Sequence, residues 1–262
     1  MEGTYDADAL YPCAHWIYEL NKLQTAIKDN EGNILSAEDR VRNKKLAQER
    51  FKLEYPIYFN KDFLIAYYVI TETLLMADSR VKNMMIATWG KKWTEYTDLD
   101  ADESIDVKFK DNEYENAGIV LTQNDTGYKG KGYYIWLEEE QEYCEYTGDN
   151  LVFPENEELN VELYQKVPII TYSEKGTPKK VYQYEWYPIF YDMDTMLGLN
   201  NEGKHVYDYY TEDTDSSVYN GEEVLWNFVR DNLNKDIAKM HQTMETNSVW
   251  KSDGILNYFN KN

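Results

Sequence analysis

Cysteine and histidine are scarce in this chain of 262 residues, which has only two cysteines and three histidines. The cysteines, Cys13 and Cys144, stand far apart, and neither belongs to a C-x-x-C pair. A disulfide framework and a cysteine-based zinc site are therefore not expected. The histidines, His15, His205 and His241, are equally scattered. A bound metal would have to use carboxylate and amide oxygens, the ligands of Mg²⁺, Mn²⁺ or Ca²⁺.

Basic residues are also few: 27 Lys and Arg face 48 Asp and Glu, which leaves a formal net charge of −21. A surface this acidic repels the phosphates of nucleic acids and anionic membranes, so we expect neither as a main partner. Long apolar runs are missing too. The longest lies within residues 63–76, and it is too short and too interrupted by polar residues to span a bilayer. The N-terminus has neither the basic nor the apolar region of a signal peptide, so a soluble protein is expected.

Aromatic residues are abundant by contrast, with 25 Tyr and 7 Trp. Disordered acidic chains are poor in aromatics, so the sequence predicts a folded chain. Its periodicity predicts helices near 10–30, 35–52, 61–76 and 221–245, and strands near 84–89, 117–122, 132–138 and 181–191. Ser36 and Asp39 form a capping-box pattern at the start of an exposed, charged helix, and Gly90-Lys91 predicts a turn. The helix at 61–76 is apolar on nearly every side, which indicates a central, buried element of an α+β fold.

Negative charge is concentrated in the middle of the chain. Residues 95–116 carry nine acids, and residues 138–160 carry nine more with no Lys or Arg. We interpret residues 94–180 as an acidic, β-rich insertion within a single domain that spans residues 1–262. Such an insertion suits a basic protein partner. A weaker alternative is a divalent-ion-binding domain in which the acids of the insertion bind Ca²⁺.

Two short polar motifs follow apolar segments. The first, Asp78-Ser79-Arg80-Val81-Lys82-Asn83, comes directly after the buried helix, and the second, Asp192-Met193-Asp194, ends the strand predicted at 181–191. Phosphoryl transfer needs one carboxylate to orient the attacking hydroxyl, and an amide oxygen with a second carboxylate to hold Mg²⁺ on the phosphates. Asp78 and Asn83 have the D-x-x-x-x-N spacing of the kinase catalytic loop. The simpler interpretation is that these are ordinary Asp and Asn turn residues.

In this order, the two motifs resemble the CotH family of atypical kinases, which is named after a spore-coat protein. The residues that match the family's motifs are Asp78, Lys82, Asn83, Trp186, Asp192, Asp194 and Gly198. The resemblance covers residues 55–92 and 181–240, less than half of the chain. The block from Tyr191 to Gly203 also resembles segments of large phage virion proteins.

The resemblance implies a kinase C-lobe-like helical core with a β-hairpin that carries the active-site loops. It implies an ATP-dependent phosphotransferase that acts on a protein acceptor, with Mg²⁺ or Mn²⁺ bound together with ATP. Asp78 would orient the acceptor hydroxyl, while Arg80 or Lys82 would neutralise charge on the transferred phosphoryl group. Asn83 and Asp192 would bind the metal and its nucleotide, and Asp194 would assist in holding the metal.

The chain departs from the kinase pattern before residue 55. No Gly-rich loop followed by a strand lysine occurs there, so nothing in this segment supplies the N-lobe of a kinase. The His-Arg pair that precedes the catalytic aspartate in many kinases is also absent before Asp78. The alternative is a catalytically inert, kinase-like module that serves protein–protein assembly, in the cytoplasm or in a phage particle. That alternative predicts a large exposed aromatic surface where a partner docks.

Overall fold

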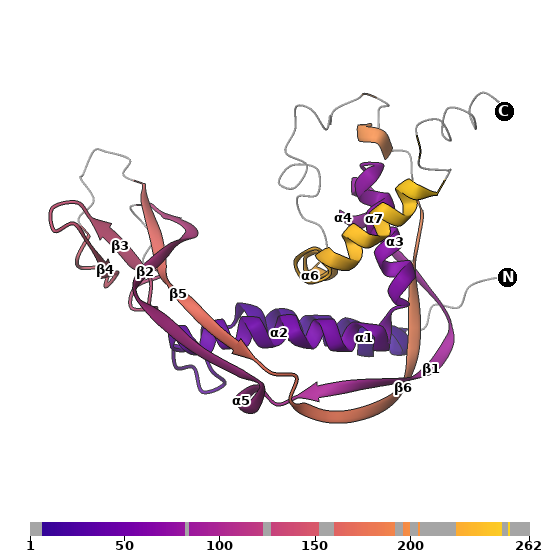
Figure 1. Cartoon of the computed structure of the whole chain (residues 1–262), viewed down its shortest axis with the longest axis horizontal. Helices are drawn as coiled ribbons and strands as arrows, with labels where there is room; N and C mark the ends of the chain where they lie inside the picture. Colours follow the sequence, from indigo (N-terminus) through magenta and orange to yellow (C-terminus); the bar gives the residue numbers. More distant parts are fainter. Residues whose placement is uncertain are drawn as a thin grey trace. The chain divides into compact units, whose positions relative to one another are not determined.

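The computed structural model describes residues 7–81, 84–122, 127–151, 160–191, 196–199, 204, 224–247 and 251. The fold is mixed α+β with two antiparallel sheets, in agreement with the predicted class (Figure 1). The helices are α1 (Ala7–Thr25), α2 (Ala37–Tyr58), α3 (Lys61–Thr73), α4 (Ala77–Val81), α5 (Ala101–Ser104), η1 (Met196–Gly198), α6 (Val224–Asn232) and α7 (Asn234–Thr246). The strands are β1 (Met85–Leu99), β2 (Ile105–Leu121), β3 (Tyr134–Leu137), β4 (Glu142–Glu145), β5 (Val161–Tyr172) and β6 (Gly176–Ile189). No described helix has the length and apolarity needed to cross a membrane.

The chain divides into two compact units. The first combines Met1–Leu20, Gln48–Asp98 and Pro178–Asn262, and the second combines Asn21–Ala47 with Leu99–Thr177. The second unit therefore contains most of the segment predicted as an acidic insertion, together with the loop between α1 and α2 and the residues on either side of it. The interpretation of residues 94–180 as an insertion in one domain stays a prediction.

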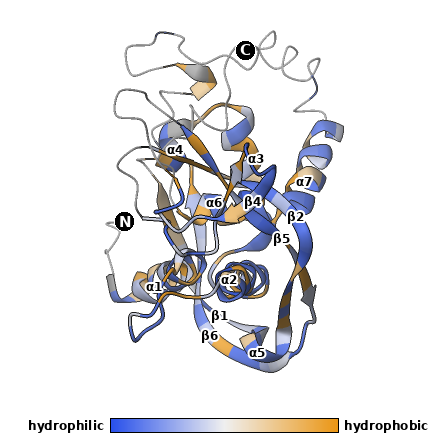
Figure 2. Ribbon diagram, turned by 90° about the vertical axis from the view of Figure 1, so that its left-hand side faces the viewer, coloured by the Kyte–Doolittle hydropathy of each residue, from blue (hydrophilic) through white to orange (hydrophobic). Residues whose placement is uncertain are grey.

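Helix α3 is the core helix of the first unit, as its apolar pattern predicts. Asn60 caps its start, because the side-chain oxygen accepts a hydrogen bond from the amide of Phe63 at 3.1 Å. Tyr67 is 1% exposed and stacks on the fully buried Trp226 of α6, with ring centroids 5.4 Å apart. Helix α7 also packs against α3, yet it has no buried residue and is coloured mainly as hydrophilic in Figure 2.

The sequence predicted one helix over residues 221–245, whereas the structure has α6 and α7. The break falls at Leu233, which is buried and leaves helical geometry with φ −113° and ψ 20°. Just before it, the Asn232 side chain donates to the carbonyl of Phe228 at 2.9 Å. An asparagine that bonds to the backbone in this way competes with the helical ladder, which accounts for the interruption.

Helix α2 begins as predicted, with the amide of Asp39 bonded to the hydroxyl oxygen of Ser36 at 3.1 Å. The expectation of an exposed helix is wrong for its second half. Phe51 is fully buried and Tyr55 is 3% exposed, and Phe51 stacks on Phe228 with centroids 5.1 Å apart. These aromatics lie four residues apart and so share one helix face, which the many charged neighbours hide in the sequence.

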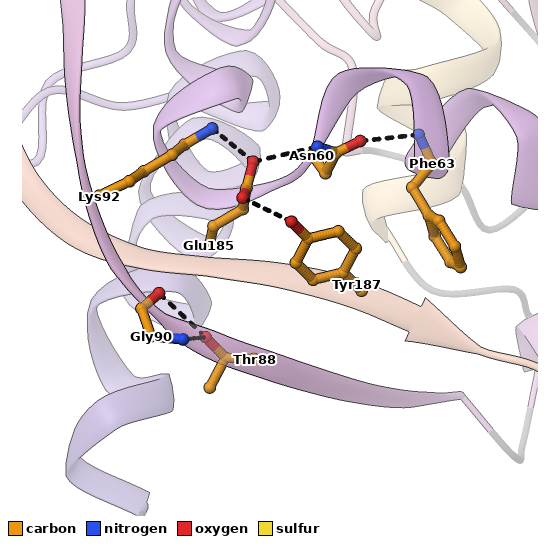
Figure 3. A network of polar contacts seen from close by, with 7 residues as sticks. All are labelled: Asn60, Phe63, Thr88, Gly90, Lys92, Glu185 and Tyr187. Atoms are coloured by element: carbon orange, nitrogen blue, oxygen red, sulfur yellow. Dashed lines mark hydrogen bonds and ion pairs between the residues drawn. The ribbon is translucent and has the colours of Figure 1, made fainter.

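The prediction of a turn at Gly90-Lys91 is wrong, because strand β1 continues through both residues. Gly90 takes a φ of +128°, a conformation that favours glycine, and so the strand distorts without reversing. The Thr88 hydroxyl accepts from the Gly90 amide at 3.1 Å and donates to its carbonyl at 3.2 Å, which holds the distortion in place (Figure 3). The segment predicted as a polar loop after α3 contains the short helix α4.

The second unit contains the four-stranded sheet, in the order β2-β5-β3-β4. One face of this sheet covers a small core of Leu121, Ile135, Tyr146 and Leu163. A second cluster joins Leu46 of α2 to Ile105 and Val107 of β2. Strand β2 is much longer than the strand predicted at 117–122. Its first half alternates apolar and charged residues, which is the pattern of a half-buried strand, whereas the sequence interpretation treated this segment as irregular.

Candidate functional site

The first predicted motif lies directly after α3. Asp78 stands in the first turn of α4 and is partly exposed, whereas its neighbour Ser79 is 1% exposed. The hydroxyl of Tyr67 donates to the carbonyl of Ser79 at 3.0 Å. This bond ties α4 to the buried face of α3 and so fixes the position of the backbone beside Asp78. Burial raises the pKa of Tyr67, so the hydroxyl keeps its proton for this bond at neutral pH.

Arg80 is fully buried inside the first unit. Its Nη2 lies 2.8 Å from Oε2 of Glu72, and its guanidinium carbon lies 4.6 Å from the ring centroid of Tyr68. A buried arginine that is paired with a carboxylate and placed over an aromatic ring stabilises the packing of the helices around it. The structure thus gives Arg80 internal partners in α3, and its predicted catalytic role stays a prediction.

Residues next to the second motif contact residues of the first. The Ser79 hydroxyl donates a long hydrogen bond of 3.5 Å to the carbonyl of Tyr191, which directly precedes Asp192 in the chain. The ring of Phe190 packs on the ring of Tyr67, with centroids 4.6 Å apart. The end of β6 therefore lies beside α4, although more than 100 residues separate the two segments in the sequence.

The chain on the other side of the second motif also returns to α3. The amide of Leu197 donates to the carbonyl of Leu74 at 2.6 Å. Two leucines at this junction have a backbone conformation that is rare for this residue. Leu75, which follows Leu74, has a φ of 49°, and Leu197 has a φ of 61°. A leucine in this left-handed conformation costs about 1–2 kcal/mol, and such strain gathers at functional sites. Gly198, part of the second motif, follows in η1.

Four of the predicted site residues, Lys82, Asn83, Asp192 and Asp194, lie outside the described residues. Among the residues that the structure describes, no group of three His, Cys, Asp or Glu is placed to hold a metal ion. The predicted set of Mg²⁺ ligands, Asn83, Asp192 and Asp194, falls wholly on the undescribed part. The structure therefore brings together the neighbours of the two motifs, and the metal site stays a prediction.

A polar network that the sequence analysis missed joins β1, β6 and the start of α3 (Figure 3). Its centre is the carboxylate of Glu185, which bonds to Lys92 of β1 and accepts from the hydroxyl of Tyr187 at 2.6 Å and from the side-chain amide of Asn60 at 3.3 Å. Burial raises the pKa of Glu185, but the bonds from Lys92 and Tyr187 outweigh it and leave this pKa below its ordinary value.

Asn60 has a second bond to β6, since its backbone amide donates to the carbonyl of Trp186 at 3.2 Å. Trp186, which matches the CotH-like pattern, is 7% exposed. The strand that leads to the second motif is thus anchored at the start of α3, and the first motif follows the end of α3. The sequence could not predict the contact between Lys92 and Glu185, because it depends on which strands pair and in which register.

Comparison with known proteins adds no relative to this picture: no protein family model matches the chain, and neither the curated proteins nor the solved structures contain a significant match.

Proposed function

We propose that this protein is a Mg²⁺-dependent, CotH-like phosphotransferase module that transfers a phosphoryl group from ATP to a protein hydroxyl. The observation that carries the proposal is the pair of contacts between Ser79 and Tyr191 and between Leu74 and Leu197. These contacts join the residues on both sides of Asp192–Thr195 to the junction of α3 and α4. A phosphotransferase needs such convergence of two distant motifs, whereas two unrelated turns do not.

In this proposal each residue has one role. Asp78, partly exposed in α4, orients the acceptor hydroxyl, while Asn83, Asp192 and Asp194 hold Mg²⁺. When bound, Mg²⁺ would neutralise the phosphates and orient them for in-line attack. Because Arg80 is buried against Glu72 and Tyr68, we assign the neutralising cation to Lys82 and a positioning role to Arg80. The strained leucines beside both motifs support this assignment, since such strain is retained where the position of the backbone matters.

The test separates nucleotide binding from transfer. ATP with Mg²⁺ should raise the melting temperature of the protein, and chelation of the metal should abolish the rise. The variant Asp192→Asn should lose this stabilisation. Asp78→Asn should keep it but lose transfer of labelled phosphate to an acceptor protein, or to the chain itself. Asp231→Asn is the matched control, because Asp231 is an exposed carboxylate of α6 and lies outside both motifs.

Absence of any Mg²⁺-dependent effect of ATP on the wild-type protein would overturn the proposal. So would equal losses in Asp78→Asn, Asp192→Asn and the control, because the effect would then not depend on the two motifs. Loss of transfer with full nucleotide binding in both motif variants would contradict the role of Asp192 as a ligand.

A second candidate is an inert module that serves protein–protein assembly, and a specific observation favours it. Three large aromatic side chains are exposed on β1 and β6: Trp89 at 89%, Trp93 at 63% and Tyr182 at 52%. Trp93 and Tyr182 contact each other across the two strands, with ring centroids 5.1 Å apart. A two-stranded sheet with such residues is typical of a surface that a protein partner covers. Failure of the nucleotide test together with weaker partner capture by Trp93→Ser would support this candidate.

A further inference from the structure

A cluster of aromatic rings lies on the four-stranded sheet of the second unit. We call it the tyrosine face, and its members are Tyr114, Tyr134, Trp136, Tyr143 and Tyr164. Tyr143 is at its centre: its ring centroid lies 4.4 Å from that of Tyr114 and 4.9 Å from those of Trp136 and Tyr164. The rings come from all four strands of the sheet, so the sheet itself holds them in place.

The tyrosine face is the side of the sheet that does not cover the small core. Along β3, the fully buried Ile135 stands between Tyr134 and Trp136, and along β5 the fully buried Leu163 precedes Tyr164. Side chains alternate between the two faces of a strand, so the rings point away from that core. All five rings are partly exposed, which leaves them accessible to a ligand.

Acidic groups stand among these rings. Glu145 pairs with Tyr134 in the register of β3 and β4, and Glu162 accepts a hydrogen bond from the hydroxyl of Tyr164 at 3.0 Å. Both glutamates are exposed. The described residues 138–151, which include β4, carry six acids and no Lys or Arg. The tyrosine face is thus an aromatic surface with a negative border.

One cation already occupies this face from within the chain. The Nζ of Lys166 lies 5.6 Å from the ring centroid of Tyr134, within the range of a cation–π contact. Lys166 belongs to β5, where it pairs with Tyr114. Among the paired positions of β2, β3, β4 and β5 that share this face, Lys166 is the only basic residue.

We propose that the tyrosine face binds a lysine- or arginine-bearing segment of a partner protein. The ring faces supply the negative side of the aromatic quadrupole, and the glutamates supply full negative charges close to it. The strong negative charge of the chain further attracts a basic segment and repels an acidic one. This surface is independent of the two motifs assigned to phosphoryl transfer, and either proposal can fail alone.

A peptide of eight lysines is the probe, and isothermal titration at low salt measures its dissociation constant. We expect Tyr143→Leu to weaken binding at least fivefold and Tyr143→Phe to leave it within twofold, because phenylalanine keeps the ring face and leucine does not. Tyr182→Leu, which removes an exposed ring of β6 in the first unit, should have no effect. Glu145→Gln should weaken binding more than Glu115→Gln, because Glu115 faces the other side of β2 from Tyr114.

A peptide that binds Tyr143→Leu as tightly as the wild type would overturn the proposal, since its binding would then need only negative charge. Hydrogen exchange on the wild-type protein gives a second test that does not depend on a folded variant. Octalysine should slow the exchange of amides within residues 134–145 and 161–166. Protection confined to other segments, or no protection at all, would contradict the assignment of this surface.

Discussion

The amide of Leu197 donates to the carbonyl of Leu74 at 2.6 Å, and two residues of this junction, Leu197 and Leu75, are held in an unfavourable backbone conformation. Leu197 itself has a φ of 61°, and Leu75, next to the accepting carbonyl, has a φ of 49°. Both leucines flank the motifs assigned to phosphoryl transfer, since Leu75 precedes Asp78 and Leu197 follows Asp194 by three residues each. The backbone conformation of these two leucines is therefore set by the surrounding contacts and not by the local preference of leucine.

The strain at Leu197 can be measured by comparing two small substitutions. Leu197 is 51% exposed, so replacing its side chain removes little packing. Glycine adopts the left-handed conformation freely and alanine does not, and so we expect Leu197→Gly to be about 1 kcal/mol more stable than Leu197→Ala. Urea unfolding of the two variants measures this difference. Equal stabilities, or a more stable alanine variant, would show that the conformation carries no strain.

The Glu185 network predicts a pH dependence of stability. The folded-state pKa of Glu185 is below its ordinary value of 4.5, so the network stabilises the protein above that pH. The contribution is lost as the pH falls from about 4.5 through the lowered pKa, because the carboxylate then gains a proton. We expect Glu185→Gln to cost about 1 kcal/mol at neutral pH, a modest value because Lys92 is about a third exposed.

Urea unfolding of wild type and Glu185→Gln between pH 3 and pH 7 checks this dependence. The difference between the two proteins should shrink as the pH falls below about 4.5. Glu95→Gln is the control, because Glu95 pairs with Lys180 across the same two strands but is 79% exposed. A difference that stays constant over the whole range would show that the carboxylate charge contributes nothing to stability.

The sequence predicted the elements whose pattern is local. The apolar faces of α3 and the strand signal of β6 are examples, because a helix or strand expresses its own periodicity. The sequence did not predict that β1 continues through Gly90, because a glycine can either end a strand or permit a distortion within it. Nor did it predict that Arg80 is buried, since a charged residue is expected in solvent until Glu72 and Tyr68 are known to surround it. The convergence of the two motifs was expected from a resemblance, and the register and long-range contacts that support it appear only in the structure.

Glu54 is the buried carboxylate that joins α1 to the second half of α2 within the first unit. It is 3% exposed, and it accepts hydrogen bonds from the indole of Trp16 and from the guanidinium of Arg50, both at 2.8 Å. Glu54→Ala leaves the buried indole of Trp16 without an acceptor and removes the ion-pair partner of Arg50, whose side chain is 31% exposed, so we expect a loss of about 2 kcal/mol in the free energy of unfolding. Glu19→Ala, which removes a carboxylate from a partly exposed position of α1, should change stability by no more than about 0.5 kcal/mol. Similar losses in both variants would mean that burial of Glu54 contributes nothing.

The two cysteines should differ in reactivity, because their surroundings differ. Cys13 of α1 is 5% exposed, and burial raises its pKa to about 12, so almost no thiolate forms at pH 8. Cys144 of β4 is partly exposed, and its pKa is raised by partial burial and by the nearby charge of Glu142. A thiol reagent that absorbs on reaction should therefore modify one cysteine per native chain, slowly, and the second only after unfolding. Cys144→Ser should abolish the first phase and leave the second. A fast reaction of both thiols in the native protein would show that α1 opens readily, and would contradict the buried position of Cys13.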